Sequence, residues 1–199
     1  MRLGIFGGTF DPPHIGHLVL ADEALNQLGL DRVLWVLTLD PPHKRGEVIS
    51  ELNHRLAMVS AAIRGNQKFE LSRVDIDRPS PHYAVDTVRL IQNEHPNSQL
   101  VYLLGGDSLE NLPLWHCPNE FVQSCHELGV MMRTGASYEY EKLEIKIPGI
   151  TAKIKFVDTP LLEISASQIR NRVKDMSSYR YYLPPSVLQI IEYRKLYRY

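Results

Sequence analysis

The sequence contains few cysteines, and this scarcity excludes two classes of protein. Cys117 and Cys125 are its 2 cysteines in 199 residues, too few for a disulfide framework. Their spacing also differs from the C-x-x-C pairs of structural zinc sites. We therefore predict reduced thiols in an intracellular protein.

Long hydrophobic runs and an excess of charge are missing as well. The longest apolar stretches, such as residues 33–37 and 100–104, are far too short to span a bilayer. Lys plus Arg total 22, Asp plus Glu total 23, and the formal net charge is −1. These values argue against a membrane protein and against a broad basic surface for nucleic acid. No signal-peptide pattern precedes the first strand-like segment, so we expect a cytoplasmic location.

The remaining composition is that of an ordinary globular protein. Hydrophobic residues make up 44% and charged residues 23% of the chain. A chain of 199 residues is long enough for one full hydrophobic core. We expect residues 1–199 to form a single domain, whose C-terminal part, from about residue 165 to 199, is helical.

The N-terminal residues predict a parallel crossover unit. Residues 2–6 form an apolar, strand-like segment that stops at Gly7-Gly8, and residues 15–28 have helical spacing. Residues 32–37 are almost all apolar, as strands of a parallel sheet are. A strand, a helix and a second buried strand in this order predict a right-handed β-α-β unit.

The rest of the chain repeats this alternation. We predict further strands at residues 69–76, 100–104, 128–132 and 152–157. Helices are predicted at residues 52–64, 83–93, 118–125, 165–174 and 186–197, and loops at residues 40–48 and 135–149. Five or six strands alternating with helices predict an α/β, Rossmann-like fold. Its sheet is doubly wound and mainly parallel, with helices on both faces and a small helical C-terminal end.

The densest functional signal is the segment GGTFDPPHIGH at residues 7–17. It follows the first strand, at the carboxyl end where open α/β sheets bind ligands. His14 and His17 are three residues apart and share one face of the first helical turn. The free N–H groups and the dipole of a helix N-terminus attract anions, and two imidazoles add donors. Gly16 leaves space between them, so we interpret the segment as a phosphate site without a Walker lysine.

The segment has two other possible interpretations. His14 and His17 alone could be ordinary polar residues at a helix start, but the whole segment is hard to explain in that way. His-x-x-His also offers two metal ligands, and Asp11 could add a third. No further His or Cys cluster is evident, so we predict no structural metal site.

The segment resembles the H-x-G-H signature of the nucleotidyltransferase α/β superfamily, which class I aminoacyl-tRNA synthetases share in a variant form. A synthetase would also need a lysine-rich loop and a tRNA-binding apparatus. Residues 174–178 are only superficially similar to that loop, and 199 residues with net charge −1 make a synthetase a poor match.

Five further segments narrow the resemblance to one family. They are Pro41-Pro42-His43-Lys44, residues 78–87, Gly105-Gly106-Asp107-Ser108 with Leu112 and Trp115 beyond, residues 164–170, and Tyr182-Leu183-Pro184 with the helix that follows. In this order they resemble the bacterial nicotinate-nucleotide adenylyltransferases. The resemblance covers nearly the whole chain except residues 135–149, and the Pro-Pro-His-Lys and Tyr-x-x-Asp-Thr elements carry it to this family.

The resemblance implies transfer of the AMP moiety of ATP to nicotinate mononucleotide, giving deamido-NAD and pyrophosphate. The mononucleotide phosphate attacks the α-phosphorus of ATP in line, so positioning and charge stabilisation dominate and no protein nucleophile is needed. Mg²⁺ is expected to bind together with ATP, chiefly through phosphate oxygens. The implied ligands are thus ATP and nicotinate mononucleotide. We expect no nucleic-acid or membrane partner, and the protein is either a monomer or a homo-oligomer.

The resemblance also assigns residues to each substrate. The implied catalytic residues are His14, His17 and Arg170. The implied ATP-binding residues are Gly7, Gly8, Thr9, Phe10, His14, His17, Asp107, Ser165, Ser167 and Arg170. The implied residues for nicotinate mononucleotide are Lys44, Tyr83, Ala84, Asp86, Thr87 and Trp115. Simpler roles stay open for several: a helix cap for Ser165, a solvated loop lysine for Lys44, a core tryptophan for Trp115, and helix-start residues for Asp86 and Thr87.

The sequence departs from the family pattern at the acceptor side. The family commonly has Pro-Thr where this chain has Leu37-Thr38, and Ser-Tyr-Thr where it has His82-Tyr83-Ala84. This chain also has Ala166 at a position where the family usually has a serine. Adenylyl transfer to nicotinamide mononucleotide or phosphopantetheine is therefore the alternative activity. A non-catalytic nucleotide sensor is the alternative of another class.

Overall fold

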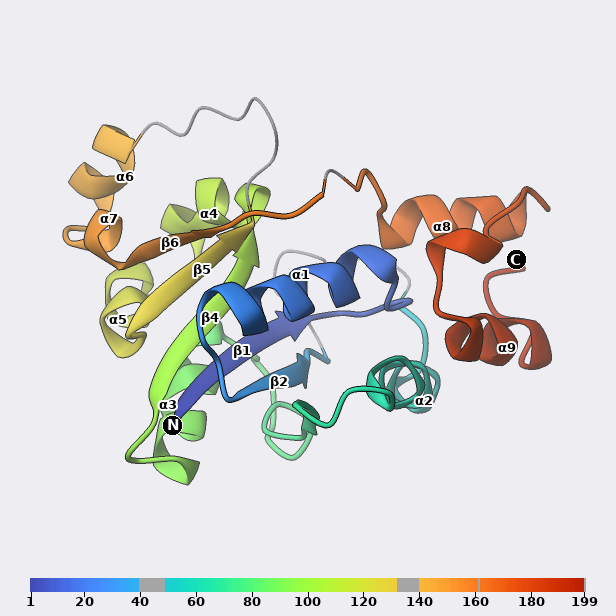
Figure 1. Cartoon of the computed structure of the whole chain (residues 1–199), viewed down its shortest axis with the longest axis horizontal. Helices are drawn as coiled ribbons and strands as arrows, with labels where there is room; N and C mark the ends of the chain where they lie inside the picture. The colour runs from blue at the N-terminus through green and yellow to red at the C-terminus, as the bar shows by residue number, and fades with distance from the viewer. Residues whose placement is uncertain (40–48, 132–139, 161, 199) are drawn as a thin grey trace.

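The computed structural model describes residues 1–39, 49–131, 140–160 and 162–198. These residues form a six-stranded, fully parallel sheet with the order β3-β2-β1-β4-β5-β6 (Figure 1). The strands are β1 (Arg2–Gly8), β2 (Arg32–Leu37), β3 (Phe69–Ser72), β4 (Gln99–Gly105), β5 (Glu127–Met131) and β6 (Ile154–Val157). The central strands are buried along almost their whole length, which explains their apolar sequence. The predicted fold class is confirmed.

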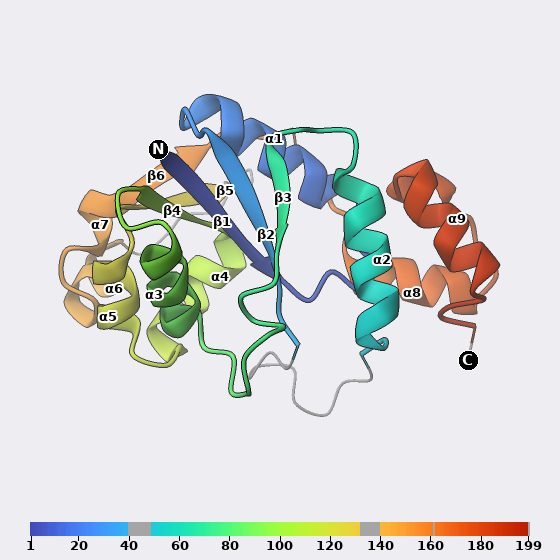
Figure 2. The same cartoon turned by 90° about the horizontal axis from the view of Figure 1, so that it is seen from below.

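Helices cover both faces of the sheet (Figure 2). One face carries α1 (Ile15–Gln27) and α2 (Leu52–Ile63), which pack on Phe6, Trp35 and Leu103 of the strands. The other face carries α3 (Ala84–Glu94), α4 (Gly106–Asn111), the 3-10 turn η2 (Leu112–Leu114), α5 (Pro118–Ser124), α6 (Tyr140–Lys146) and α7 (Ile150–Lys153). On α3, Val85, Val88 and Ile91 recur every three residues and turn one buried stripe toward the sheet.

The C-terminal helices form a third packing unit at one end of the molecule. They are α8 (Ala166–Lys174), the 3-10 turn η3 (Arg180–Tyr182) and α9 (Pro185–Tyr193). Ile169 of α8 and Ile191 of α9 pack with Met58 of α2. Both figures show α9 beside α2, at the far end from α5 and α6 (Figures 1 and 2). The chain end therefore returns to the N-terminal half.

Several predicted boundaries were wrong: the last helix ends at Tyr193 and not at residue 197. Three others differ for local reasons. The strand predicted at 69–76 ends at Ser72, because a turn in which Arg73 O accepts from Ile76 and Asp77 N–H carries the chain off the sheet. The strand predicted at 152–157 begins only at Ile154, after α7. The loop predicted at 135–149 contains α6 from Tyr140, because Leu143 and Ile147 are four residues apart and both buried. The earlier part of that loop, like the loop predicted at 40–48, lies outside the described residues.

The helix α4 was not predicted at all. It starts directly after β4, at the glycine pair that sequence patterns mark as a strand end. Among the described helices, none is long and apolar enough to cross a bilayer. The single domain and the cytoplasmic location stay predictions.

Candidate active site

The site lies where the chain changes direction in the sheet. From β1 the strand order runs through β2 and β3 to one edge, and through β4, β5 and β6 to the other. Ligands of open α/β sheets bind at such a switch point, beyond the carboxyl ends of the strands. A cavity of about 1270 Å³ opens there, next to Gly8 at the end of β1 and Gly105 at the end of β4. Its volume exceeds the ~300–1,000 Å³ usual for one drug-sized ligand, so two nucleotide-sized molecules have room.

Most of the residues predicted for the site line this cavity. They are Gly7, Gly8, Thr9, Phe10, His14, His17, Tyr83, Ala84, Thr87, Asp107, Trp115, Ser165, Ser167 and Arg170. Asp86 is not among the described lining residues; its carboxylate lies 4.0 Å from Arg89 on the outer side of α3. Lys44 lies outside the described residues.

The two histidines at the start of α1 hold each other in place. His14 is the N-cap, with an extended backbone, and its N–H donates to Nδ1 of His17 at 3.1 Å. Their ring centroids are 3.6 Å apart. Because Nδ1 of His17 accepts this bond, its neutral ring carries the hydrogen on Nε2. The first helical turn thus fixes the tautomer of His17.

His14 is a buried, neutral group. Burial lowers the pKa of His14 to about 4, so the ring carries no charge near pH 7. Gly16 gives this ring room, since a Cβ there would lie 3.2 Å from the His14 ring, which is tighter than usual side-chain contacts. The His14 ring thus lies against the space that the missing side chain of Gly16 leaves. Positive charge at this end of the cavity must then come from other groups or from protonation on ligand binding.

The loop from Gly7 to Phe10 is shaped by its last residue. Phe10 has a φ of 47° and its ring is buried among the aromatic residues of the α1 face. A Cβ on Gly8 would lie 2.8 Å from the tip of that ring, so glycine is required there. Phe10 thus lines the cavity while its buried ring anchors the loop.

A buried arginine supports the loop from below. Arg55 of α2 donates to the carbonyls of Thr9 (3.1 Å), Thr38 (2.8 Å) and Ser50 (2.9 Å). Burial lowers the pKa of Arg55, and the nearby Asp11 carboxylate opposes this shift. Arg55 was not predicted from the sequence. The available signal was its place on the buried stripe of α2, four residues before Val59.

A second helix N-terminus faces the same cavity. Ser165 caps α8 by accepting a hydrogen bond from Gln168 N–H at 3.2 Å, and it also lines the cavity. Ser167 follows in the first turn. Nη1 of Arg170 donates to the main-chain oxygen of Asp11 at 2.9 Å, which joins α8 to the loop before α1. Donors from two helix starts and one guanidinium therefore converge on one space.

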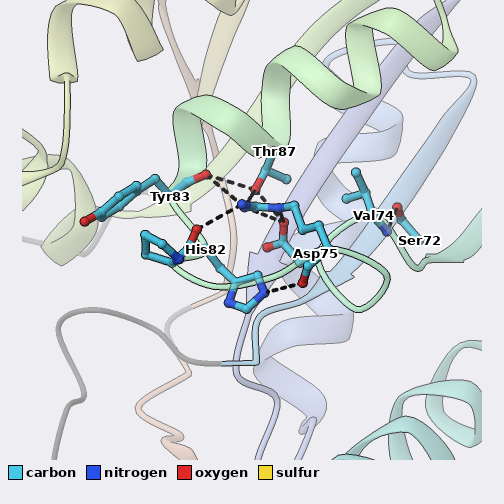
Figure 3. A network of polar contacts seen from close by, with 8 residues as sticks. Ser72, Val74, Asp75, His82, Tyr83 and Thr87 are labelled. Atoms are coloured by element: carbon cyan, nitrogen blue, oxygen red, sulfur yellow. Dashed lines mark hydrogen bonds and ion pairs between the residues drawn. The ribbon is translucent and has the colours of Figure 1, made fainter.

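The opposite side of the cavity is built on a polar network before α3 (Figure 3). Asp75 is buried; its Oδ1 accepts from the Thr87 hydroxyl at 2.8 Å and from Nε of Arg78 at 3.0 Å. Arg78 also donates to the carbonyls of Pro81 (3.0 Å) and Tyr83 (3.3 Å). Figure 3 shows the Thr87 hydroxyl directed at Asp75, inside the network. Thr87 thus holds the segment that carries Tyr83 into the cavity wall.

Several cavity residues were not predicted from the sequence. The aromatic rings of Tyr83 and His116 stack at 4.0 Å, and the Tyr102 hydroxyl lies at the foot of the cavity near Gly7. His82 is buried, with Nε2 3.3 Å from the Arg78 carbonyl oxygen and Nδ1 without a partner among the described residues. Asp75 and His82 become recognisable only once the turn after β3 places them at this wall.

Comparisons with known proteins agree on one class. A family model described as cytidylyltransferase-like matches residues 5–172. A probable nicotinate-nucleotide adenylyltransferase of Thermomicrobium roseum is 43% identical over 99% of this chain and 92% of its own length. The nicotinate-nucleotide adenylyltransferase of Bacillus subtilis is 36% identical, over 98% of each chain. The class of protein is therefore a nucleotidyltransferase.

A solved structure supports the fold. Plasmodium falciparum nicotinic acid mononucleotide adenylyltransferase complexed with NaAD matches with a TM-score of 0.80 and 21% identity, covering 98% of this chain and 97% of that chain. Together with the close sequence relatives, these findings place the chain in the nicotinate-nucleotide adenylyltransferase family.

Proposed function

We propose that this protein transfers AMP from ATP to nicotinate mononucleotide, releasing pyrophosphate and forming deamido-NAD. The observation that carries the proposal is the single cavity that joins two helix N-termini and Arg170 on one side to the Tyr83 wall on the other. We call the first side the phosphate end (residues 7–17, 165, 167 and 170) and the second the acceptor end (residues 75, 82–84, 87, 115 and 116).

The reaction needs orientation more than covalent chemistry. A phosphate oxygen of the mononucleotide forms a bond to the α-phosphorus of ATP, while the bond from that phosphorus to the pyrophosphate oxygen breaks. Negative charge shifts toward the leaving pyrophosphate, so donors near the phosphates favour the transition state over the bound substrates. The phosphate end supplies the N-termini of α1 and α8, Ser167 and Arg170.

His17 is the proposed donor closest to the reacting phosphates. Because Nδ1 accepts from the His14 N–H, the donor hydrogen of the neutral ring lies on Nε2, the nitrogen proposed to donate to a phosphate oxygen. His14 packs against it and fixes its ring plane. This arrangement supports a role in stabilising charge rather than in removing a proton.

Mg²⁺ is proposed to enter with ATP. Among the described residues, no group of three or more His, Cys, Asp or Glu side chains could hold a metal ion alone. The donor set instead fits a cation held mainly by phosphate oxygens, with Asp107 as the carboxylate at the cavity wall. When bound, the ion would neutralise phosphate charge, while Arg170 and the two helix starts orient the triphosphate.

At the acceptor end we propose that the pyridine ring lies near Trp115, with main-chain groups from Tyr83 and Ala84 facing its substituent. Trp115 lines the cavity while packing on Phe121 at 5.2 Å, so it combines a core contact with a cavity contact. The Asp75 network supports the Tyr83 segment from behind.

A direct assay tests this function. Purified protein is mixed with Mg-ATP and one of three acceptors: nicotinate mononucleotide, nicotinamide mononucleotide or phosphopantetheine. We expect pyrophosphate release to be fastest with nicotinate mononucleotide. Absence of release with that acceptor would refute the proposal, and faster release with the amide would assign the amide as substrate.

A further inference from the structure

Asp11 is a junction between the phosphate end and three distant parts of the chain. The residue is only 3% exposed. Its Oδ2 accepts from the Ser50 N–H at 2.9 Å, just before α2. Its main-chain oxygen accepts from Nη1 of Arg170 at 2.9 Å. One residue thus links the loop before α1, the start of α2 and the guanidinium of α8.

The third link comes from the C-terminal tail. The Tyr197 hydroxyl donates to Oδ1 of Asp11 at 2.6 Å, across 186 residues of sequence. The Tyr197 ring packs against the C-terminal cluster of α8 and α9. Burial, and next the Asp11 carboxylate, raise the pKa of this hydroxyl, so it keeps its proton and remains a donor.

We infer that Tyr197 is a positioning residue for the ATP phosphates, acting through Asp11 on Arg170. The inference rests on the proposed function in taking ATP as the ligand of the phosphate end. It assigns a task to the hydroxyl of a tail residue that itself lies outside the cavity lining.

The charges around Asp11 explain why this hydroxyl matters. Asp11 carries a negative charge beside two cations, Arg55 and Arg170. Arg55 is committed to the loop carbonyls. Arg170 already binds the main-chain oxygen of Asp11, so an Asp11 carboxylate that has lost the Tyr197 donor is expected to attract this guanidinium. A guanidinium drawn toward that carboxylate is drawn away from the triphosphate.

The geometry separates this role from an effect on the acceptor. Asp11 and Arg170 belong to the phosphate end, whereas the acceptor end is held by Asp75, Arg78 and Thr87. A shift at Asp11 should therefore change ATP affinity and leave acceptor affinity as it was. General loosening of the fold would change both.

The test compares Tyr197→Phe with Tyr193→Phe. The first variant keeps the packed ring and removes only the hydroxyl. The second removes a hydroxyl from a tyrosine that is 88% exposed, on the same C-terminal segment. Binding of a non-hydrolysable ATP analogue with Mg²⁺ is measured by calorimetry, and the KM for each substrate in the pyrophosphate assay.

We expect Tyr197→Phe to weaken binding of the ATP analogue, and to raise the KM for ATP, by about tenfold. This is the scale of one lost hydrogen bond to a charged group. The KM for the acceptor should stay within about twofold, and Tyr193→Phe should match the unmodified protein. In an Arg170→Ala background, Tyr197→Phe should cause no further loss of affinity for the ATP analogue, because its effect passes through Arg170.

Each other result overturns the inference. Unchanged ATP affinity in Tyr197→Phe would do so, as would an equal rise in both KM values, or an additive effect with Arg170→Ala. A Tyr197→Phe chain that no longer melts cooperatively would show that the hydroxyl holds the fold instead. The calorimetry reports on ATP alone, so a failed acceptor assay would count against the proposed function and not against this inference.

Discussion

The phosphate end and the acceptor end of the cavity are built in different ways. The phosphate end starts from one contiguous segment, in which the spacing of His14, Gly16 and His17 already defines the local geometry. The acceptor end is assembled from a turn, a helix start and the residues after α4, held by the buried Asp75. A contiguous anion site is a property of one helix start, whereas an assembled wall depends on the surrounding fold.

Charge also differs between the two ends. Cations and helix starts gather at the phosphate end, where Arg170 lines the cavity and Arg55 supports its floor. At the acceptor end the one buried carboxylate, Asp75, is matched by Arg78 at 2.9 Å. The first end is thus suited to an anion brought by a ligand, and the second is balanced before any ligand arrives.

The largest expected effect tests the chemistry of the phosphate end. His17→Ala removes the proposed Nε2–H donor, and we expect turnover to fall by more than tenfold, toward the ~10²–10³ typical of a lost charge-stabilising donor. The measurement is kcat from pyrophosphate release at saturating substrates. The KM for the acceptor serves as the internal control and should stay within about twofold. Turnover close to that of the unmodified protein would contradict the assigned role.

The next effect concerns stability at the phosphate end. The pKa of His14 is about 4 in the folded chain, against 6.5 for an ordinary histidine. The folded state therefore disfavours protonation, so the contribution of His14 is complete above pH 6.5 and is lost as pH falls from 6.5 toward 4. The loss is expected to reach about 3 kcal/mol of unfolding free energy, at ~1.4 kcal/mol per pKa unit.

Urea unfolding between pH 7.5 and 4 measures this loss, with His14→Gln as the matched control. The glutamine variant does not titrate, so its stability should fall less steeply over the same range. Parallel curves for the two proteins would mean that His14 is not the group responsible.

How far each end could be predicted follows from the same difference. The helix start at residues 14–17 was predictable because capping, dipole and side-chain spacing are all local. The sequence also predicts a helix start at Ser165; this residue caps α8 and lines the cavity, and its contact with ATP stays a prediction. Arg55 and Tyr197 were not recognised, because their partners lie far away in sequence.

At the acceptor end, small errors in the predicted secondary structure changed which side chains were expected in the cavity wall. The strand predicted at residues 69–76 left no place for the turn after Ser72 that buries Asp75. Asp86 and Thr87 were treated alike, yet the helical phase of α3 turns Thr87 inward and Asp86 toward Arg89 outside. The strand-and-helix pattern thus predicted the sheet and the existence of the site, but not which side chains make its second wall.

The smallest expected effect sharpens the comparison from the acceptor side. Thr87→Val keeps the shape of the side chain but removes the hydroxyl that bridges Asp75, Arg78 and the Tyr83 carbonyl. Because this network holds the Tyr83 segment without itself supplying charge to the phosphates, we expect the KM for the acceptor to rise about fivefold, on the scale of one neutral hydrogen bond. The KM for ATP should stay within about twofold.

Steady-state kinetics with each substrate varied in turn checks both values. An equal rise for ATP would mean that the two ends are coupled through the sheet, and the division of the cavity into two independently supported walls would be wrong.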